Sequence, residues 1–453
     1  MPRHTETVAA LATPVGTSAL AIIRISGPDT RRVAGAVFGS PPPLRVATHL
    51  SYRDLGGSAV DDVVATLFAG PHSYTGEDSL EVSCHGSPFI AQKILSDLLA
   101  RGCRPASPGE FTQRAFLNGR MDLSQAEAVM DLIQARSERA LAAARAVLHG
   151  ALSRHLAEIV GPTLGALAAV EAHIDFPDED LPPEDRGRLA EAVSLALRGS
   201  ERLLATERTG VLLREGISTV IIGEPNAGKS SLLNRIVGSD RAIVSPEPGT
   251  TRDFIEERVN AGPYGLRLID TAGLNPGALG IEAQGVEKTL ERAAAADLYL
   301  LVLDAGRPTP SLPLSLGDRM THLNTVVALN KADLLADGAR PVATAPMGFP
   351  VVRVSALNGE GIPPLLAAIT RLADGLQQTV GEEQIAINVR HAHFLGEARA
   401  CLEGALLKIG TRAPAELLAS DLRGALSALG EISGRVDNER MLDQLFASFC
   451  IGK

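Results

Sequence analysis

The segment GEPNAGKSS, which begins at Gly223, combines residue types at a spacing that can hold phosphate oxygens. It fits the pattern G-x-x-x-x-G-K-[ST] and lies between an apolar run typical of a strand and a sequence that favours a helix. Gly223 and Gly228 allow the backbone to curl so that its N–H groups point at phosphates. Lys229 can neutralise the β/γ charge, and Ser230 can bind magnesium. The segment predicts a nucleotide site.

Further segments, each in the order expected along the chain, add guanine specificity. Asp270 of DTAG (270–273) can hold magnesium through a water molecule, and Thr251 of GTTRD is the expected switch threonine on the same ion. The Asp333 carboxylate of NKAD (330–333) can accept hydrogen bonds from both guanine N–H donors, which adenine does not offer. SAL (355–357) can close over the base. The set resembles that of the translation-factor-type GTPases and predicts GTP binding.

The GTP-binding residues expected from these segments come from the phosphate loop, the switch segment, DTAG, NKAD and SAL. They are Asn226, Ala227, Gly228, Lys229, Ser230, Ser231, Ser245, Pro246, Glu247, Pro248, Gly249, Thr250, Thr251, Asp270, Thr271, Ala272, Gly273, Asn330, Lys331, Asp333, Ser355, Ala356 and Leu357.

Hydrolysis needs a group that these motifs do not supply. Ras-type GTPases place a glutamine directly after the DTAG-type glycine to orient the attacking water. Here that position is Leu274, which cannot orient a water molecule, and no residue can be identified from the sequence as an arginine finger. Asn226, inside the phosphate loop, is a candidate for holding a monovalent cation that supplies the missing charge.

The bulk composition indicates a folded, cytoplasmic protein. The chain has 453 residues, which suffices for two to four domains, and 45% of them are apolar. Its net charge of −10 excludes a generally basic nucleic-acid-binding surface, although not a local basic patch. The four cysteines show no CxxC spacing, which favours reduced thiols, and the N-terminus lacks a signal-peptide pattern. The longest apolar runs are too short to span a bilayer, so no membrane association is expected.

The elements that must position these motifs change in type along the chain. Residues 19–25 and 61–68 read as strands, and residues 87–102 read as a helix closed by Gly102. From Ser124 to about Glu215 the composition is helical, with a break at the acidic, proline-containing residues 175–187. Strands at 218–223, 266–270, 298–304, 325–330 and 351–355 then alternate with helical segments, which indicates a parallel sheet with helices on both faces.

Helical composition returns after residue 385. We therefore predict a P-loop GTPase domain of α/β class (216–376) inserted into an all-helical domain (121–215 and 377–453), preceded by a small α+β domain (1–120). The stripe Leu442, Leu445, Phe446 and Phe449 would dock the final helix on the core, leaving the last four residues to project.

Outside the α/β module, three segments resemble the MnmE (TrmE) family of tRNA-modification GTPases. They are PHSYTGEDSLEVSCHG (71–86), SPGEFTQRAFLNGRMDLSQAEAV (107–129) and the terminal FCIGK. Together with the GTPase motifs, these segments extend the resemblance to essentially the whole chain. The resemblance implies a homodimer that acts with the flavin-containing partner MnmG (GidA), in a heterotetramer-type complex. FAD would be bound only by the partner. Together they would install an aminomethyl-type group on carbon 5 of the wobble uridine of certain tRNAs.

The resemblance also implies site roles. A potassium ion would replace the arginine finger, with ligands from Asn226, Ser245, Glu247 and Thr250, and Glu282 would position the attacking water. One departure is that Asn275, followed by Pro276 and Gly277, stands where many members have an arginine, so the resemblance does not fix the switch movement or the GTPase rate; the nucleotide ligands are untouched. A tetrahydrofolate derivative (5-formyl- or methylene-type) would be bound in the N-terminal domain by Arg24, Glu81, Arg120 and Lys453. Cys450 is a candidate for assisting the modification chemistry.

Several alternatives stay open at this point. The chain could be an RNA-associated GTPase of ribosome assembly, or a folate-dependent transferase in which GTP hydrolysis is only a conformational clock. Arg24 and Arg120 could make ordinary surface ion pairs. Cys450 could merely pack, as free cysteines often do. Cys84 and His85 are adjacent and cannot chelate a metal alone.

Overall fold

The computed structural model describes residues 6–175, 185–239, 256–270, 296–310, 318–335, 340–345, 348–376 and 385–434, together with 442, 445–447, 449–450 and 452. The chain forms two compact units. One comprises Met1–Met130 with Gly430–Lys453, and the other comprises Asp131–Leu429. The predicted domain boundaries at 120, 215 and 376 stay predictions.

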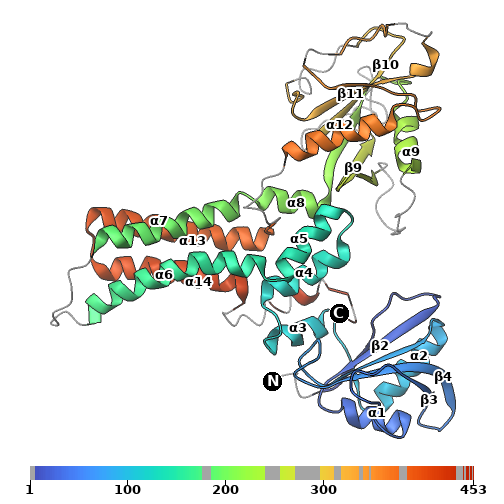
Figure 1. The fold of residues 1–453 in the computed structure, drawn as a ribbon, viewed down its shortest axis with the longest axis vertical. Helices are drawn as coiled ribbons and strands as arrows, with labels where there is room; N and C mark the ends of the chain where they lie inside the picture. The colour runs from blue at the N-terminus through green and yellow to red at the C-terminus, as the bar shows by residue number, and fades with distance from the viewer. Residues whose placement is uncertain are drawn as a thin grey trace, which may run out of the picture. The chain divides into compact units, whose positions relative to one another are not determined.

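The first unit is built on a six-stranded sheet with the order β3-β4-β5-β2-β1-β6, coloured blue in Figure 1. Neighbouring strands are antiparallel except for the short parallel β1–β6 pair. The strands are β1 (Val8–Leu11), β2 (Leu20–Ser26), β3 (Thr48–Arg53), β4 (Ala59–Phe68), β5 (Ser79–His85) and β6 (Arg104–Pro105). The predicted strands at 19–25 and 61–68 are confirmed as β2 and β4.

Helices α1 (Thr30–Phe38) and α2 (Pro88–Ala100) pack on the apolar side of this sheet. Alternation along β4 places Val63, Ala65 and Leu67 in the core, because successive side chains of a strand point to opposite faces. The predicted helix at 87–102 is confirmed as α2, and Gly102 follows its end with a positive φ of 97°. Helices α3 (Glu110–Leu117) and α4 (Leu123–Gln134) follow, α4 crossing into the second unit.

A buried guanidinium fixes α3 to the rest of the first unit. The Arg114 side chain is only 1% exposed, and its two terminal nitrogens donate to Glu110 Oε1 (2.8 Å) and Glu77 Oε2 (2.9 Å). Burial raises the pKa of the Glu110 carboxyl. Hydrogen bonds from Arg104, from the Ser107 N–H and from Arg114 outweigh burial, so the pKa lies below the ordinary glutamate value. A buried charge is tolerated here because each carboxylate and guanidinium has a partner.

The second unit contains a six-stranded sheet with the order β12-β11-β10-β7-β9-β8. Its strands are β7 (Ile217–Ile222), β8 (Glu256–Ala261), β9 (Tyr264–Asp270), β10 (Leu298–Asp304), β11 (Thr325–Asn330) and β12 (Val351–Arg353). All predicted strands of this module are confirmed. The sequence analysis did not include β8, which pairs antiparallel with β9, so the sheet is parallel except at this edge.

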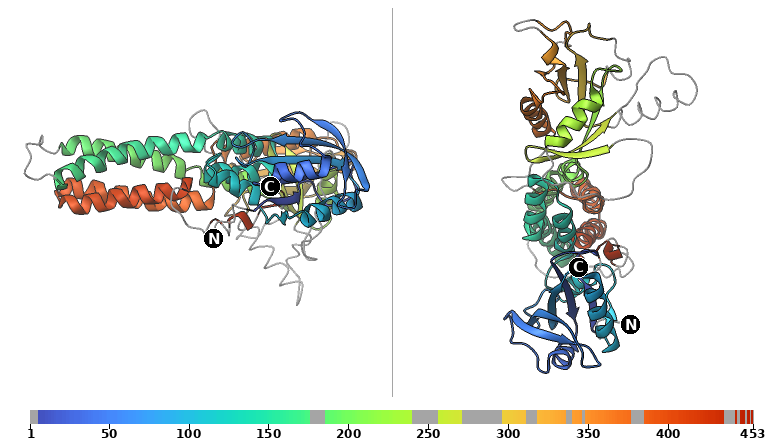
Figure 2. Two further views of the ribbon diagram at one scale, coloured as in Figure 1. Left: turned by 90° about the horizontal axis from the view of Figure 1, so that it is seen from below. Right: turned by 90° about the vertical axis from the view of Figure 1, so that its right-hand side faces the viewer.

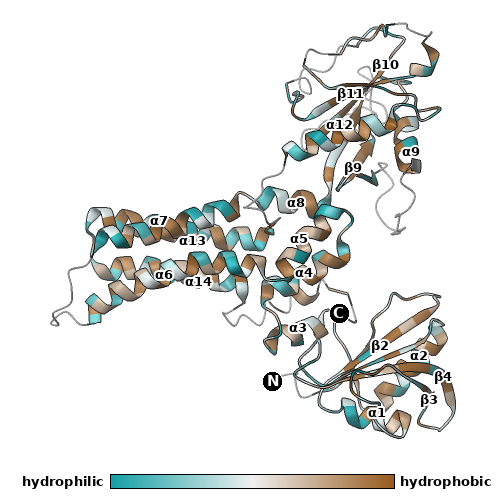
Figure 3. Cartoon of the chain, in the orientation of Figure 1, coloured by the Kyte–Doolittle hydropathy of each residue, from teal (hydrophilic) through white to brown (hydrophobic). Residues whose placement is uncertain are grey.

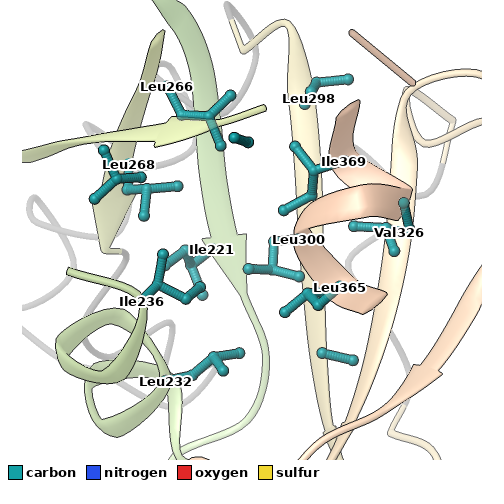
Figure 4. Packing of buried hydrophobic residues seen from close by; sticks show 14 of the residues in the cluster. Ile221, Leu232, Ile236, Leu266, Leu268, Leu298, Leu300, Val326, Leu365 and Ile369 are labelled. Atoms are coloured by element: carbon teal, nitrogen blue, oxygen red, sulfur yellow. The ribbon is translucent and has the colours of Figure 1, made fainter. Parts of the chain in front are cut away.

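Buried side chains cover both faces of this sheet, as is typical of a parallel sheet. On one face, strand residues pack against α9 (Lys229–Ser239) and α12 (Ile362–Gly375). Figure 4 shows this layer, with Ile221 from β7, Leu232 and Ile236 from α9, and Leu365 and Ile369 from α12. On the other face, Tyr299, Leu301 and Val327 contact Met320 and Ala343 from connecting segments. Strands β10 and β11 are almost wholly apolar for this reason (Figure 3).

Helices from both flanks of the sheet module form one bundle. Its long helices are α6 (Ala151–Asp175), α7 (Arg186–Leu204), α13 (Val389–Thr411) and α14 (Ala415–Ser433), and they lie side by side in Figure 2. Ion pairs between Arg423 and Glu171 (2.8 Å), and between Lys408 and Asp421, link α14 to its neighbours. The predicted fold class is therefore confirmed, with the α/β module inserted in a helical domain. The predicted break at 175–187 lies mostly outside the described residues.

Short helices connect the bundle to the sheet module. Helix α5 (Glu138–Leu148) begins where the Arg139 N–H donates to the Pro263 carbonyl (3.2 Å), beside the β8–β9 turn. Arg214, at the end of α8 (Glu207–Glu215), forms a bidentate pair with Asp131 at 2.8 and 3.0 Å. These contacts tie helical segments that precede the module to one another and to the β8–β9 turn. Among the described helices, none has the length and apolar character needed to cross a membrane.

We predict that Glu110→Gln lowers the free energy of unfolding of the first unit by about 3 kcal/mol at pH 7, because it leaves the buried Arg114 with one carboxylate fewer. Glu110 has a lowered folded-state pKa, so its contribution is present above the ordinary value of 4.5 and is lost as the pH falls through the lower folded value. The difference from the unsubstituted chain should therefore shrink at pH 3. Urea unfolding, followed by hydrogen exchange of peptides from residues 6–130, measures it.

Glu6→Gln is the matched control, because its carboxylate pairs with Arg104 but is 56% exposed. We expect it to cost less than about 1 kcal/mol. Equal effects of the two substitutions at pH 7 would contradict the assigned role of Glu110.

Candidate functional site

The phosphate loop joins the buried strand β7 to helix α9 through two tightly packed glycines. A Cβ atom on Gly223 would lie 2.3 Å from the Val302 carbonyl oxygen, and one on Gly228 would lie 2.2 Å from the Asn330 side-chain nitrogen. Asn226, between them, has a φ of 65°, a left-handed conformation that asparagine tolerates better than most residues. The loop therefore depends on the glycine and asparagine positions that the sequence pattern singled out.

Lys229 lies inside this loop, at the first turn of α9. Its ammonium donates to the main-chain carbonyls of Gly223 (3.0 Å) and Glu224 (2.9 Å). Burial lowers the pKa of Lys229, and the nearby Asp270 carboxylate opposes this shift. A buried ammonium held by neutral carbonyls favours an anion beside it, and the helix N-terminus adds a positive potential.

A pair of oxygen ligands lies next to Lys229. Ser230 Oγ donates to Asp270 Oδ2 (2.7 Å), and Asp270 is only 3% exposed at the end of β9. The second oxygen, Asp270 Oδ1, is buried and has no hydrogen-bond partner among the described residues. A hydroxyl beside an unsatisfied buried carboxylate fits a hard cation such as Mg²⁺, which prefers oxygen ligands.

The Asn330 side chain joins the phosphate loop to the predicted base-binding loop. Its Nδ2 donates to the Ala227 carbonyl (2.8 Å), and its Oδ1 accepts from the Ala356 N–H (3.0 Å). Asp333 Oδ1 accepts from Ser355 Oγ (2.6 Å), which holds the carboxylate against the same loop. Leu357, the last residue of SAL, follows Ala356 in the sequence and is exposed. The structure thus brings NKAD and SAL together beside the phosphate loop.

Two contributing residues were missed by the sequence analysis. Asp304, at the end of β10, pairs with the Lys331 ammonium (2.7 Å), and Lys331 has a left-handed φ of 63°. Arg235 of α9 donates from Nε to the Ala356 carbonyl (3.0 Å). The position of Asp304 after the apolar run LYLLVL was an available signal, because ligands bind at the carboxyl ends of parallel strands. Arg235 acts on backbone atoms and gives no such signal.

The switch residues lie outside the described part of the chain. These are Ser245, Pro246, Glu247, Pro248, Gly249, Thr250, Thr251, Thr271, Ala272, Gly273, Leu274, Asn275 and Glu282. Asn226 is therefore the described member of the predicted potassium set, and Ser230 that of the predicted magnesium set. Of the remaining predicted nucleotide ligands, Ala227 is buried and Ser231 is exposed.

A separate polar site lies on the sheet of the first unit. Arg24 of β2 and Glu81 of β5 are directly opposite in the register, and Arg24 Nη2 and Nε donate to Glu81 Oε1 at 2.8 and 3.0 Å. The guanidinium carbon lies 5.4 Å from the Tyr74 ring centre and 5.6 Å from that of Phe111. Burial raises the pKa of the Tyr74 hydroxyl. Arg120 is exposed and makes no ion pair with Glu81 among the described residues, and Lys453 is outside them.

The chain end corrects one expectation. The apolar stripe docks as predicted, with Leu442, Phe446 and Phe449 buried in a cluster with Leu123 of α4. The last residues were expected to project, but Gly452 is buried and its carbonyl accepts from Arg24 Nη1 (3.3 Å). The prediction failed because it considered the helix stripe and not long-range backbone contacts. The Cys450 side chain is exposed.

The pair Cys84 and His85 has no metal-binding geometry. Cys84 is buried, with its thiol near the Ala21 carbonyl (3.5 Å), whereas the exposed His85 ring contacts Asp61 Oδ1 (2.8 Å). Successive residues of a strand point to opposite faces, which separates them. Within the described ranges no cluster of three or more His, Cys, Asp or Glu side chains could hold a metal ion.

Comparison with known proteins places both units in one family. Residues 7–120 match the family described as "GTP-binding protein TrmE N-terminus", and residues 123–450 match "MnmE helical domain". A protein of Opitutus terrae named tRNA modification GTPase MnmE is 57% identical over the full length of both chains. A protein of the same name from Symbiobacterium thermophilum is 43% identical over 99% of each chain.

A solved structure also matches part of the chain. The G domain of the T. maritima FeoB iron transporter is 26% identical over 35% of this chain and 98% of its own, with a TM-score of 0.26, too low to support any conclusion. The matches over the full length are decisive. The chain belongs to the MnmE (TrmE) family of tRNA modification GTPases.

Proposed function

We propose that this chain is a potassium-activated GTPase whose cycle drives modification of carbon 5 of the wobble uridine in certain tRNAs. It would act in the cytoplasm as a homodimer, together with a flavoprotein of the MnmG (GidA) type that carries the FAD. The observation that carries the proposal is the convergence of Lys229, Asp270 and Asn330 at one edge of a parallel sheet, in a chain of this family.

Guanine recognition is assigned to Asp333. Its carboxylate is held by Ser355, and the adjacent Asn330 amide is fixed by two main-chain contacts, so both are pre-oriented beside the phosphate loop. A pre-oriented carboxylate accepts two hydrogen bonds from the N1–H and N2–H edge of guanine. Adenine offers no matching pair of donors there, so it is rejected.

Magnesium is assigned to Ser230 and Thr251, with Asp270 acting through a water molecule. The ion would stabilise the negative charge of the nucleotide phosphates. Ser230 Oγ and the buried Asp270 carboxylate have the oxygen chemistry that this ion needs. Lys229, which lies on neutral carbonyls, would exchange them for charged phosphate oxygens.

The group that completes catalysis is assigned to a potassium ion and Glu282. Leu274 cannot orient a water molecule, so the developing charge on the phosphates needs another source. Asn226 lies in the phosphate loop with its backbone in a conformation that few residues adopt. Together with Ser245, Glu247 and Thr250 it would hold the potassium ion, and Glu282 would position the attacking water.

The Arg24–Glu81 site is assigned to a tetrahydrofolate derivative of the 5-formyl or methylene type. A pteridine presents amide-like N–H donors to a carboxylate, and its glutamate tail pairs with basic groups, for which Arg120 and Lys453 are proposed. The aromatic rings of Tyr74 and Phe111 beside Arg24 suit a flat heterocycle. Cys450 is exposed and lies two residues before the Gly452 carbonyl that Arg24 contacts, and it would assist the one-carbon chemistry.

We predict that Asp333→Asn weakens GTP binding roughly thirty-fold or more, since losing a hydrogen bond to a charged group costs about 2 kcal/mol. The same variant should gain affinity for xanthosine triphosphate, whose base edge offers an acceptor to the asparagine amide. Titration calorimetry with the two nucleotides measures both, and the gain with xanthosine triphosphate serves as the folding control. Unchanged GTP affinity would sink the assignment of Asp333 to base recognition.

We predict that GTP turnover is higher in potassium than in sodium buffer of equal ionic strength, on the order of 100-fold, which is the scale of electrostatic transition-state stabilisation. Asn226→Ala and Asn226→Gly should both abolish the difference. The glycine variant is the control, because it accepts the left-handed φ of 65° without strain. Glu282→Ala should lower turnover and leave GTP binding nearly intact. Equal turnover in both buffers would refute the potassium assignment.

We predict that Cys450→Ser abolishes the modified wobble nucleoside in tRNA from cells that carry only this variant, because a hydroxyl is a far weaker nucleophile than a thiolate. Cys401→Ser, a change at the partly exposed cysteine of α13, is the matched control and should leave the nucleoside present. Nucleoside analysis of purified tRNA by mass spectrometry measures both. Normal modification with Cys450→Ser would assign that thiol to packing.

A further inference from the structure

The backbone around Cys450 is held at two points. The Gly109 N–H, at the start of α3, donates to the Cys450 carbonyl (3.3 Å), and Arg24 Nη1 donates to the Gly452 carbonyl (3.3 Å). Just before them, Phe446 and Phe449 are buried with their ring centres 5.1 Å apart. The main chain is thus fixed on both sides of a side chain that is itself exposed.

Both backbone contacts require glycine. Gly109 has a φ of 67°, and a Cβ atom there would lie 2.8 Å from the Phe446 carbonyl oxygen and 2.9 Å from Phe449 Cβ. Gly452 has a φ of 93°, and its Cβ would lie 2.5 Å from the Leu11 carbonyl oxygen. A side chain at either position would be strained by the backbone conformation and would also displace main-chain atoms.

Arg24 belongs at once to the polar site and to the chain end. Two of its nitrogens are committed to a single Glu81 oxygen, which aims the third, Nη1, at the Gly452 carbonyl. The Tyr74 and Phe111 rings lie within 6 Å of its guanidinium carbon and restrict it further. A lysine could pair with Glu81 but has no fork with which to reach the carbonyl as well.

We infer that Arg24, Gly109 and Gly452 are positioning residues that hold the chain end so that the Cys450 thiol is presented beside the Arg24–Glu81 site. This rests on the proposed function, in which that site takes a one-carbon carrier and Cys450 assists the transfer. Arg24 then has two roles, one toward the bound ligand and one toward the thiol that acts on it. Of the other three cysteines, Cys84 and Cys103 do not compete, since both are buried and burial raises the pKa of both thiols.

The test follows the mobility of a nitroxide attached to Cys450. Full-length chain carrying Cys401→Ser is labelled with a methanethiosulfonate spin label, and labelling at Cys450 is verified by peptide mass spectrometry. We expect a motionally restricted electron paramagnetic resonance spectrum. Arg24→Lys, Gly452→Ala and Gly109→Ala should each lose the restricted component in favour of a mobile one, because each removes a contact that fixes the backbone.

Matched controls separate tail release from general strain. Gly39→Ala introduces the same kind of change at a φ of 83° where no atom lies within 4 Å, and Arg31→Lys alters an exposed ion pair with Asp78. Both should retain the restricted spectrum. A mobile spectrum in the unsubstituted chain, or an unchanged one in Arg24→Lys and Gly452→Ala, would overturn the inference.

A second measurement connects the positioning of the chain end by Arg24, Gly109 and Gly452 to function. Gly452→Ala and Gly109→Ala should lower wobble-uridine modification in cells at least tenfold and leave GTP hydrolysis at the level of Gly39→Ala. The spin-label result needs no ligand or tRNA. If the label responds as expected but the unsubstituted chain supports no modification, the proposed function is contradicted and the positioning of the chain end is supported. If the chain modifies tRNA and the label does not respond, only the positioning of the chain end is contradicted.

Discussion

The side-chain amide of Asn330 is the contact on which the nucleotide site depends. In a parallel sheet the strands end at one edge, so loops from distant parts of the sequence meet there. Asn330, at the end of β11, donates to the phosphate loop at Ala227 and accepts from the loop at Ala356. Gly228 must lack a side chain because Asn330 occupies that space. One amide therefore fixes the distance between the phosphate loop and the loop at Ala356, and Arg235 of α9 holds the second of these loops.

The first unit uses two guanidinium groups in a comparable way, one buried and one partly exposed. Arg114 is surrounded by carboxylates and ties α3 to the strand region, and it acts where apolar packing alone would not specify an orientation. Arg24 is partly exposed. It donates hydrogen bonds to Glu81 and to the Gly452 carbonyl, which is more than 400 residues away in the sequence. Such contacts fix the orientation of the side chains more than they add stability. A planar guanidinium has few orientations in which it reaches all of its acceptors. The chain end becomes part of the N-terminal site through this specificity.

The sequence was informative wherever local pattern and position coincide. The motifs that follow apolar strands could be placed because a strand end defines where a side chain emerges, and β7, β9, β10 and β11 were read correctly for that reason. Strand β8 was missed because Glu256 and Glu257 interrupt any apolar alternation at its start. It forms a strand by pairing with β9, and its own sequence does not indicate that pairing. Asp304 and Arg235 were missed because they act through another side chain or a main-chain carbonyl. The expectation that Gly452 projects from the fold was wrong because this residue packs on Leu11, a contact with no local signal in the sequence.

The two sites share a feature that bears on how ligands would be recognised. In each, a cation rests on main-chain carbonyls: Lys229 on those of Gly223 and Glu224, and Arg24 on that of Gly452. A neutral carbonyl is a weaker acceptor for a cation than a charged oxygen, because it carries only a partial negative charge. For Lys229, burial lowers the pKa, and the nearby Asp270 carboxylate offsets only part of that shift. An anionic ligand would offset the remainder at Lys229 without unfolding the loop. At Arg24 the carbonyl belongs to the chain end, so any ligand that draws on the guanidinium must share it with the residues that hold Cys450.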